Sequence, residues 1–180
     1  MNNLRIVALI LGGLGVAGGA WALCFPDVAQ RFFRELPRNQ TLGRILMAVN
    51  VAWALWLLEP MRLGEWEWIK RVLYVLGPVF YLLIIFYARN YLGARSVALF
   101  LILAAKPVVN ICFLRDEPSR LAVTTLAYLG VAAGICLVAV PHWMRDLFSF
   151  FRARPERWAW GCRMKIAMGA ALIALAFLAY

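Results

Sequence analysis

Two uninterrupted apolar runs constrain this chain more than any other feature of its sequence. Ile6 to Phe25 and Leu121 to Val140 each hold 20 residues without a charged side chain. An α-helix needs about 20 such residues to cross the hydrocarbon core of a bilayer, and it satisfies its backbone polar groups internally. Both runs are therefore predicted to be transmembrane helices.

Four further segments follow the same pattern but are shorter or contain a basic residue. They are Thr41 to Leu58, Val72 to Ala88, Ser96 to Leu114 and Gly161 to Tyr180. Basic residues near the start of a span, such as Arg44, can extend to the interface at little cost. The chain is 64% hydrophobic and 16% charged, whereas soluble domains are about 45–50% apolar and about 25% charged. The sequence predicts one all-α membrane domain over residues 1–180 with six transmembrane helices.

The basic residues indicate how the chain sits in the membrane. Its formal charge is +10, and most of this charge lies in short segments after the first, third and fifth spans. Such segments favour the cytoplasmic side and anionic lipids, and they argue against a nucleic-acid partner. We expect a multi-pass protein of a bacterial-type inner membrane, with both termini outside (periplasmic). The predicted headgroup-binding residues are Arg31, Arg34, Arg145, Arg152 and Arg154.

The first and fifth spans end alike. GVAGGAWALCFP at 15–26 and GVAAGICLVAVP at 130–141 share five residues at an offset of 115. After each proline, apolar residues recur at the spacing of one helix face. The sequence predicts two short interfacial amphipathic helices and a parallel internal repeat of helices 1–2 and 5–6. The expected organisation is repeat A over 4–58, a middle hairpin over 68–114 and repeat B over 119–180. The likeness also favours retaining the first span over cleaving it as a signal peptide at Ala20–Ala22.

Both copies of the repeat carry a G-x-x-x-G motif, which lets helix backbones approach closely. The motif residues are Gly15 and Gly19 in the first copy and Gly130 and Gly134 in the second. We expect the first and fifth spans to pack tightly, on each other or on a partner chain. The alternative is that these glycines are ordinary membrane-helix residues.

Lys106 is the charged residue nearest the middle of a predicted span. Pro107 follows it, and Gly77-Pro78 predicts a matching interruption in the third span. Neighbouring broken helices can expose polar backbone toward a cavity, as in transporters. A solute, ion or proton site would draw on Lys106, Asn110, Glu59, Asn50, Tyr74 and Tyr81. Alternatively, the fourth span ends near Ala105, or Lys106 extends to the interface.

Catalytic chemistry has little support in this sequence. His142 is the one histidine, which excludes bis-histidine haem ligation, and it follows Pro141 as an interfacial cap. The four cysteines have no disulfide or zinc spacing. Gly13–Gly18 matches G-x-G-x-x-G, but no alternating strand and helix pattern follows it. No metal site or cofactor is expected.

The leading functional interpretation is a non-catalytic membrane protein that binds lipid or a partner, as a subunit or assembly factor. A second copy of the chain or another membrane protein would be the protein partner. The alternative is a component of a small-solute, ion or proton transporter or channel that uses Lys106 and Asn110. A lipid-modifying enzyme that uses the arginine-rich inner loops is the third interpretation.

Overall fold

The computed structural model describes residues 3–62, 64–87, 91–113 and 120–178 of the 180-residue chain. These residues form helices and no strands. The helices are α1 (Asn3–Cys24), α2 (Pro26–Glu35), α3 (Gln40–Leu58), α4 (Glu67–Tyr87), α5 (Leu92–Cys112), α6 (Arg120–Ala139), α7 (His142–Arg152) and α8 (Pro155–Leu178), with a short 3-10 turn η1 (Gly64–Trp66) before α4. Among the described residues, six helices are long and apolar enough to cross a membrane: α1, α3, α4 with η1, α5, α6 and α8. The predicted all-α chain with six candidate spans is confirmed.

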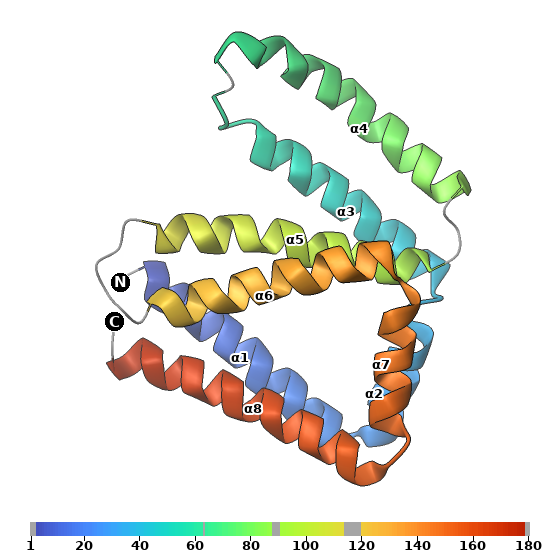
Figure 1. Ribbon diagram of the computed structural model, residues 1–180, viewed down its shortest axis with the longest axis vertical. Helices are drawn as coiled ribbons and strands as arrows, with labels where there is room; N and C mark the ends of the chain where they lie inside the picture. The colour runs from blue at the N-terminus through green and yellow to red at the C-terminus, as the bar shows by residue number, and fades with distance from the viewer. Residues whose placement is uncertain (1–2, 63, 88–90, 114–119, 179–180) are drawn as a thin grey trace.

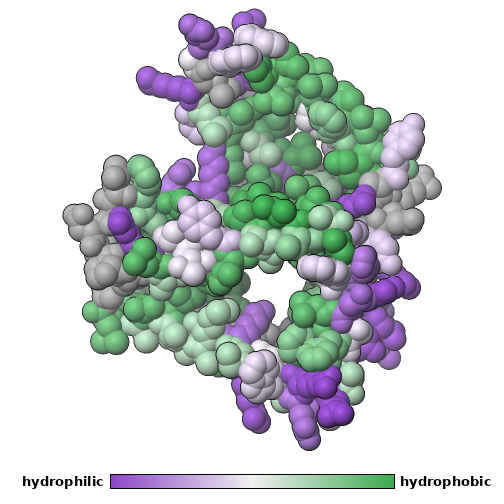
Figure 2. All heavy atoms as spheres, in the orientation of Figure 1, coloured by the Kyte–Doolittle hydropathy of each residue, from purple (hydrophilic) through white to green (hydrophobic). Residues whose placement is uncertain are grey.

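Large apolar side chains cover the outside of these helices. Leu14 of α1 is 66% exposed and Val75 of α4 is 68% exposed, and no residue of α4 is buried. Figure 2 shows hydrophobic residues along the helices and hydrophilic residues gathered over the end formed by α7. Such surfaces are stable when lipid rather than water surrounds them. The chain therefore has the character of a multi-pass membrane protein.

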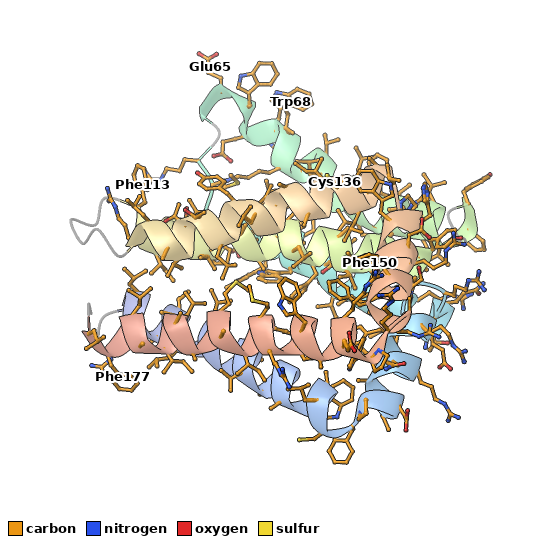
Figure 3. All side chains as sticks on the ribbon, turned by 60° about the horizontal axis from the view of Figure 1, so that its bottom comes forward. Glu65, Trp68, Phe113, Cys136, Phe150 and Phe177 are labelled. Carbon is orange, nitrogen blue, oxygen red and sulfur yellow. The ribbon has the colours of Figure 1, made fainter. Side chains whose placement is uncertain are left out.

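The six long helices pack in pairs. Helix α1 lies along α8, and α6 lies along α5, while α3 packs on the other side of α5 (Figure 1). Helix α4 packs mainly on α3 rather than on α5, which follows it in the chain. Helices α2 and α7 cross the same end of the bundle. Helix α1 begins and α8 ends at the opposite end (Figure 1), and Figure 3 shows Phe177 and Phe113 there, far from Phe150 of α7.

Glycines let the backbones of α1 and α8 approach closely. A Cβ atom on Gly12 would lie 2.7 Å from the carbonyl oxygen of Gly169, and a Cβ on Gly169 would lie 2.7 Å from the carbonyl oxygen of Gly12. Real Cβ atoms do not approach backbone oxygens so closely. The two residues must therefore both be glycine for this contact to form.

Polar side chains join α3 to α5. The buried Asn50 amide donates to the carbonyl of Ser96 at 2.7 Å, and the Ser96 hydroxyl lies 2.8 Å from the carbonyl oxygens of both Gly43 and Leu92. Near this point a Cβ on Gly43 would lie 2.8 Å from the backbone nitrogen of Gly93. The α3–α5 contact thus combines close backbone approach with hydrogen bonds inside the protein, although the buried Asn50 Oδ1 has no hydrogen-bond partner among the described residues.

Several helices begin before their predicted starts. Helix α8 begins at Pro155 rather than Gly161, α4 at Glu67 rather than Val72, and α5 at Leu92 rather than Ser96. Proline suits the first helical position, because its missing N–H has no intrahelical partner there. An acidic residue in the first turn, such as Glu67, interacts favourably with the helix dipole. Polar first turns therefore belong to the helices, although they lie outside the apolar runs.

The internal prolines do not interrupt their helices. Helix α4 continues through Pro78 and α5 continues through Pro107 as far as Cys112. The expected interruptions are absent because one missing N–H removes one hydrogen bond and leaves the others in place. The predicted ends at Ala88, Leu114 and Tyr180 lie outside the described residues.

Candidate functional site

Helices α2 and α7, of 10 and 11 residues, are the shortest α-helices of the described chain. Pro26 occupies the start of α2, Asp27 lies in its first turn and Arg34 in its last turn. Helix α7 follows Pro141 and ends with Arg152. Acidic first turns and basic last turns both complement the helix dipole. One buried residue on each, Ala29 and Met144, marks the side that faces the bundle.

Aromatic side chains join α2, α7 and α8. The rings of Phe33 and Phe148 stack with centroids 4.8 Å apart, and Phe33 also meets the edge of Trp158 at 6.1 Å. The indole Nε1 of Trp158 donates to the carbonyl of Ala22 at 3.1 Å. Trp158 is 8% exposed. It therefore holds α8 against the end of α1, whereas Trp160 is 61% exposed.

Three arginines share one pocket on the polar side of α2 and α7. Arg31 and Arg34 of α2 and Arg152 of α7 line a surface pocket of about 400 Å³. Asp27 and Gln30 complete its wall. In the described part of the chain, none of the three guanidinium groups forms an ion pair. Unpaired guanidinium groups at one site are suited to binding a phosphate, because each presents a fork of N–H donors.

The other two predicted headgroup residues lie elsewhere. Arg145 forms an ion pair with Asp146 at 3.0 Å, and the hydrogen bond that it donates to this carboxylate raises the pKa of Arg145 above its usual value. Arg154 lies after the end of α7, where its carbonyl accepts from the backbone of Arg157. The structure therefore brings three of the five predicted arginines together. Asp27 and Gln30 were not predicted, although their spacing places them on the face of Arg31 and Arg34.

The residues of the predicted transport site are spread along α3. Lys106 Nζ donates to the Leu57 carbonyl at 3.0 Å, near the end of α3, and Tyr74 donates to Leu55 at 3.4 Å. Tyr81 meets the Arg44 carbonyl at 3.5 Å, near the start of α3. The remaining predicted members are the buried Asn50, the exposed Asn110 and Glu59 at the end of α3. Lys106 and Asn110 lie one turn apart on α5, and the structure does not gather the set around one cavity.

The two glycine motifs face different helices of the same chain. Gly15 and Gly19 face α8, where a Cβ on Gly19 would lie 2.6 Å from Ile166 Cγ1. Gly134 faces α5, and nothing lies within 4 Å of the space beside Gly130. The first and fifth spans thus have α8 and α5 as their main neighbours rather than each other. Local sequence does not reveal which helix a glycine face meets.

No cluster of metal ligands appears in the described ranges. They contain no group of three or more His, Cys, Asp or Glu side chains placed to hold a metal ion. Helix α1 runs without a break through Gly13–Gly18, so this segment does not form the turn of a dinucleotide-binding motif. Comparison with protein-family models, curated proteins and solved structures gives no match.

Proposed function

We propose that this protein is a non-catalytic, multi-pass membrane protein that binds anionic lipid headgroups at the α2–α7 surface. The observation that carries the proposal is the pocket lined by Arg31, Arg34 and Arg152. These three positively charged guanidinium groups form no ion pair in the described chain, so they attract a lipid that carries a phosphate. The protein would act as a lipid-binding subunit or assembly factor, alone, as a homo-oligomer or with another membrane protein.

The position of α2 and α7 supports their assignment as interfacial amphipathic helices. Both cross the end of the bundle where the long helices α1, α3, α6 and α8 meet them. Their apolar sides carry Phe33 and Phe148 toward the bundle, while Arg31, Arg34 and Arg152 lie on the polar side. A helix of this kind lies in the headgroup layer with its apolar face toward the hydrocarbon core.

Two pairs of equivalent residues support the proposed internal repeat. Phe33 and Phe148 differ by the repeat offset of 115 and contact each other. Gly19 and Gly134 differ by the same offset, and each faces an isoleucine Cγ1 and a backbone carbonyl of a neighbouring helix. Duplicated halves that pack about a common axis produce this kind of self-contact.

The charge distribution supports a location in the inner membrane with both termini outside. The end of the bundle with α2 and α7 carries the excess of arginines, and the end where α1 begins and α8 ends carries fewer. The positive-inside rule places the arginine-rich end in the cytoplasm.

The alternative, a transporter that uses Lys106, has less support. The ammonium of Lys106 is bound by the Leu57 carbonyl, at the negative end of the α3 dipole. This contact is sufficient to stabilise the charge without a transported ion. We therefore place lipid binding first.

Native mass spectrometry of the protein in nanodiscs with equal phosphatidylglycerol and phosphatidylcholine tests the proposal. The wild type should retain phosphatidylglycerol, and the triple variant Arg31→Gln, Arg34→Gln, Arg152→Gln should lose this preference. Each arginine near an anionic surface contributes about 1 kcal/mol, so the loss should be about 100-fold. The control triple variant Arg62→Gln, Arg71→Gln, Arg120→Gln removes the same charge at the opposite end. Equal retention by both variants would contradict the proposal.

A further inference from the structure

An apolar cavity lies on the bundle side of the Phe33–Phe148 stack. It has a volume of about 340 Å³ and is lined by Gly18, Gly19 and Ala22 of α1, Phe33 of α2, Phe148 and Phe151 of α7, and Trp158, Gly161, Cys162 and Lys165 of α8. Figure 2 shows a gap in the atoms between α6 and the α1–α8 pair, beside α7. Cavities of this size and apolar lining are typical of ligand pockets.

Lys165 is the one charged residue in this lining. It lies ten residues after Pro155, about 15 Å along α8 at 1.5 Å per residue. Its ammonium lies over the backbone of Gly18, since a Cβ on Gly18 would be 3.0 Å from Lys165 Nζ. Gly18 precedes the end of α1 at Cys24 by six residues, about 9 Å. The ammonium therefore lies deeper in the bundle than the point at which α1 ends and α2 begins.

Lys165 differs from the other two lysines of the chain in its partners. Lys106 Nζ donates to the Leu57 carbonyl, and Lys70 Nζ contacts Glu67. Within the described residues, Lys165 Nζ has no hydrogen bond and no ion pair. Lys165 is an exposed residue of the described chain, and a cation without a protein partner at the depth of a membrane-spanning helix generally marks a binding site or pathway.

We propose that this cavity binds a long-chain carboxylate, with its carboxylate on Lys165 and its chain against the aromatic lining. The apolar lining suits an acyl chain and disfavours water. Lys165 provides one strong donor group, and the Trp158 N–H is already used by the Ala22 carbonyl. One compact ammonium suits a single carboxylate, whereas the planar guanidinium forks of the arginine pocket suit a phosphate.

The cavity is distinct from the arginine pocket of the proposed function. Phe33 and Phe151 face the cavity, whereas the residues that follow them, Arg34 and Arg152, line the pocket on the polar side. The aromatic stack separates the two. The two proposed sites share no lining residue and are therefore independent of each other.

Equilibrium binding of radiolabelled palmitate to the protein in phosphatidylcholine nanodiscs tests the site, with empty nanodiscs as background. The wild type should bind palmitate saturably, close to one molecule per chain. Lys165→Gln should weaken binding about tenfold or more, because it removes the positive charge that pairs with the palmitate carboxylate. Lys165→Arg should largely restore it. Arg163→Gln is the matched control, since it removes a nearby charge of α8 that does not line the cavity.

Two further measurements keep the proposal falsifiable. Neutral 1-hexadecanol should bind the wild type and Lys165→Gln equally, and Gly18→Leu should reduce the binding of both ligands by filling the cavity. The triple arginine variant should bind palmitate as the wild type does. Binding that does not exceed the background, or equal palmitate binding by Lys165→Gln and the wild type, would overturn the proposal. Displacement of palmitate by equimolar phosphatidylglycerol would also overturn it, because the occupant would then be a phospholipid.

Discussion

The rings of Phe33 and Phe148 stack with centroids 4.8 Å apart and planes inclined by 26°. Each lies seven residues after a proline, Pro26 or Pro141, on one of the two short helices α2 and α7. Their contact joins the two halves of the chain at one end of the bundle. It also separates the arginine pocket from the apolar cavity.

Replacing either ring should weaken this junction to a similar extent. We expect Phe33→Ala and Phe148→Ala each to lower the free energy of unfolding by about 2 kcal/mol, since each ring is half-buried. The double variant should lose less than the sum of the two, with a coupling of about 1 kcal/mol for the stacked pair. Thermal unfolding in one detergent measures all three. The lipid-facing Phe86→Ala serves as the control, and strictly additive losses would contradict the contact.

The glycines of α6 provide a matched pair of variants. A Cβ on Gly134 would lie 2.8 Å from the carbonyl oxygen of Ala98, which cannot move without shifting α5, whereas the space beside Gly130 is open. Gly134→Ala should therefore destabilise the protein by about 1–3 kcal/mol, as overpacking does. Gly130→Ala should be neutral or slightly stabilising. The melting temperature and the elution profile in detergent report both outcomes, and identical behaviour of the two variants would count against the α5–α6 packing.

Lys106 is expected to contribute to stability. Lys106→Gln loses the charged hydrogen bond to the Leu57 carbonyl, and we expect a loss of about 1.5–3 kcal/mol. Lys106→Arg should retain most of this stability. Melting temperatures test the pair. A stable Lys106→Gln protein that has lost a transport activity would instead support the alternative function.

The two ends of the chain should carry reporters to the same side of the membrane. Six crossings return the chain to its starting side, and the arginine-rich end favours the cytoplasm. Alkaline phosphatase fused at either terminus should be active in the periplasm, and a green fluorescent protein fused there through the same export route should not fluoresce. Fusions truncated within 142–152 should show the opposite pattern. Reporters of opposite activity at the two termini would exclude an even number of crossings.

The six spans could be predicted because each depends on its own composition. Ile6–Phe25 and Leu121–Val140 match α1 and α6 within a few residues, since no charge interrupts them. The start of α8 at Pro155 was missed by six residues, because its polar first turns resemble a loop in composition. Helix ends in the headgroup layer are not marked by hydrophobicity alone.

The pairing of helices and the position of Lys165 could not be predicted. Both depend on contacts between segments far apart in the chain, such as Gly18 of α1 with Lys165 of α8. The sequence places Lys165 near the start of a span, where a charge costs little. The earlier start of α8 and its pairing with α1 bring Lys165 to the lining of the apolar cavity.

Helix α4 has no buried residue and rests mainly on α3. Protein packing therefore restrains its inclination on one side only. The tilt of α4 will therefore also depend on the thickness of the surrounding bilayer, because the apolar stretch of α4 must match the hydrocarbon layer. In a thinner membrane α4 will lean further from the normal, while the glycine-locked α1–α8 pair keeps its crossing geometry.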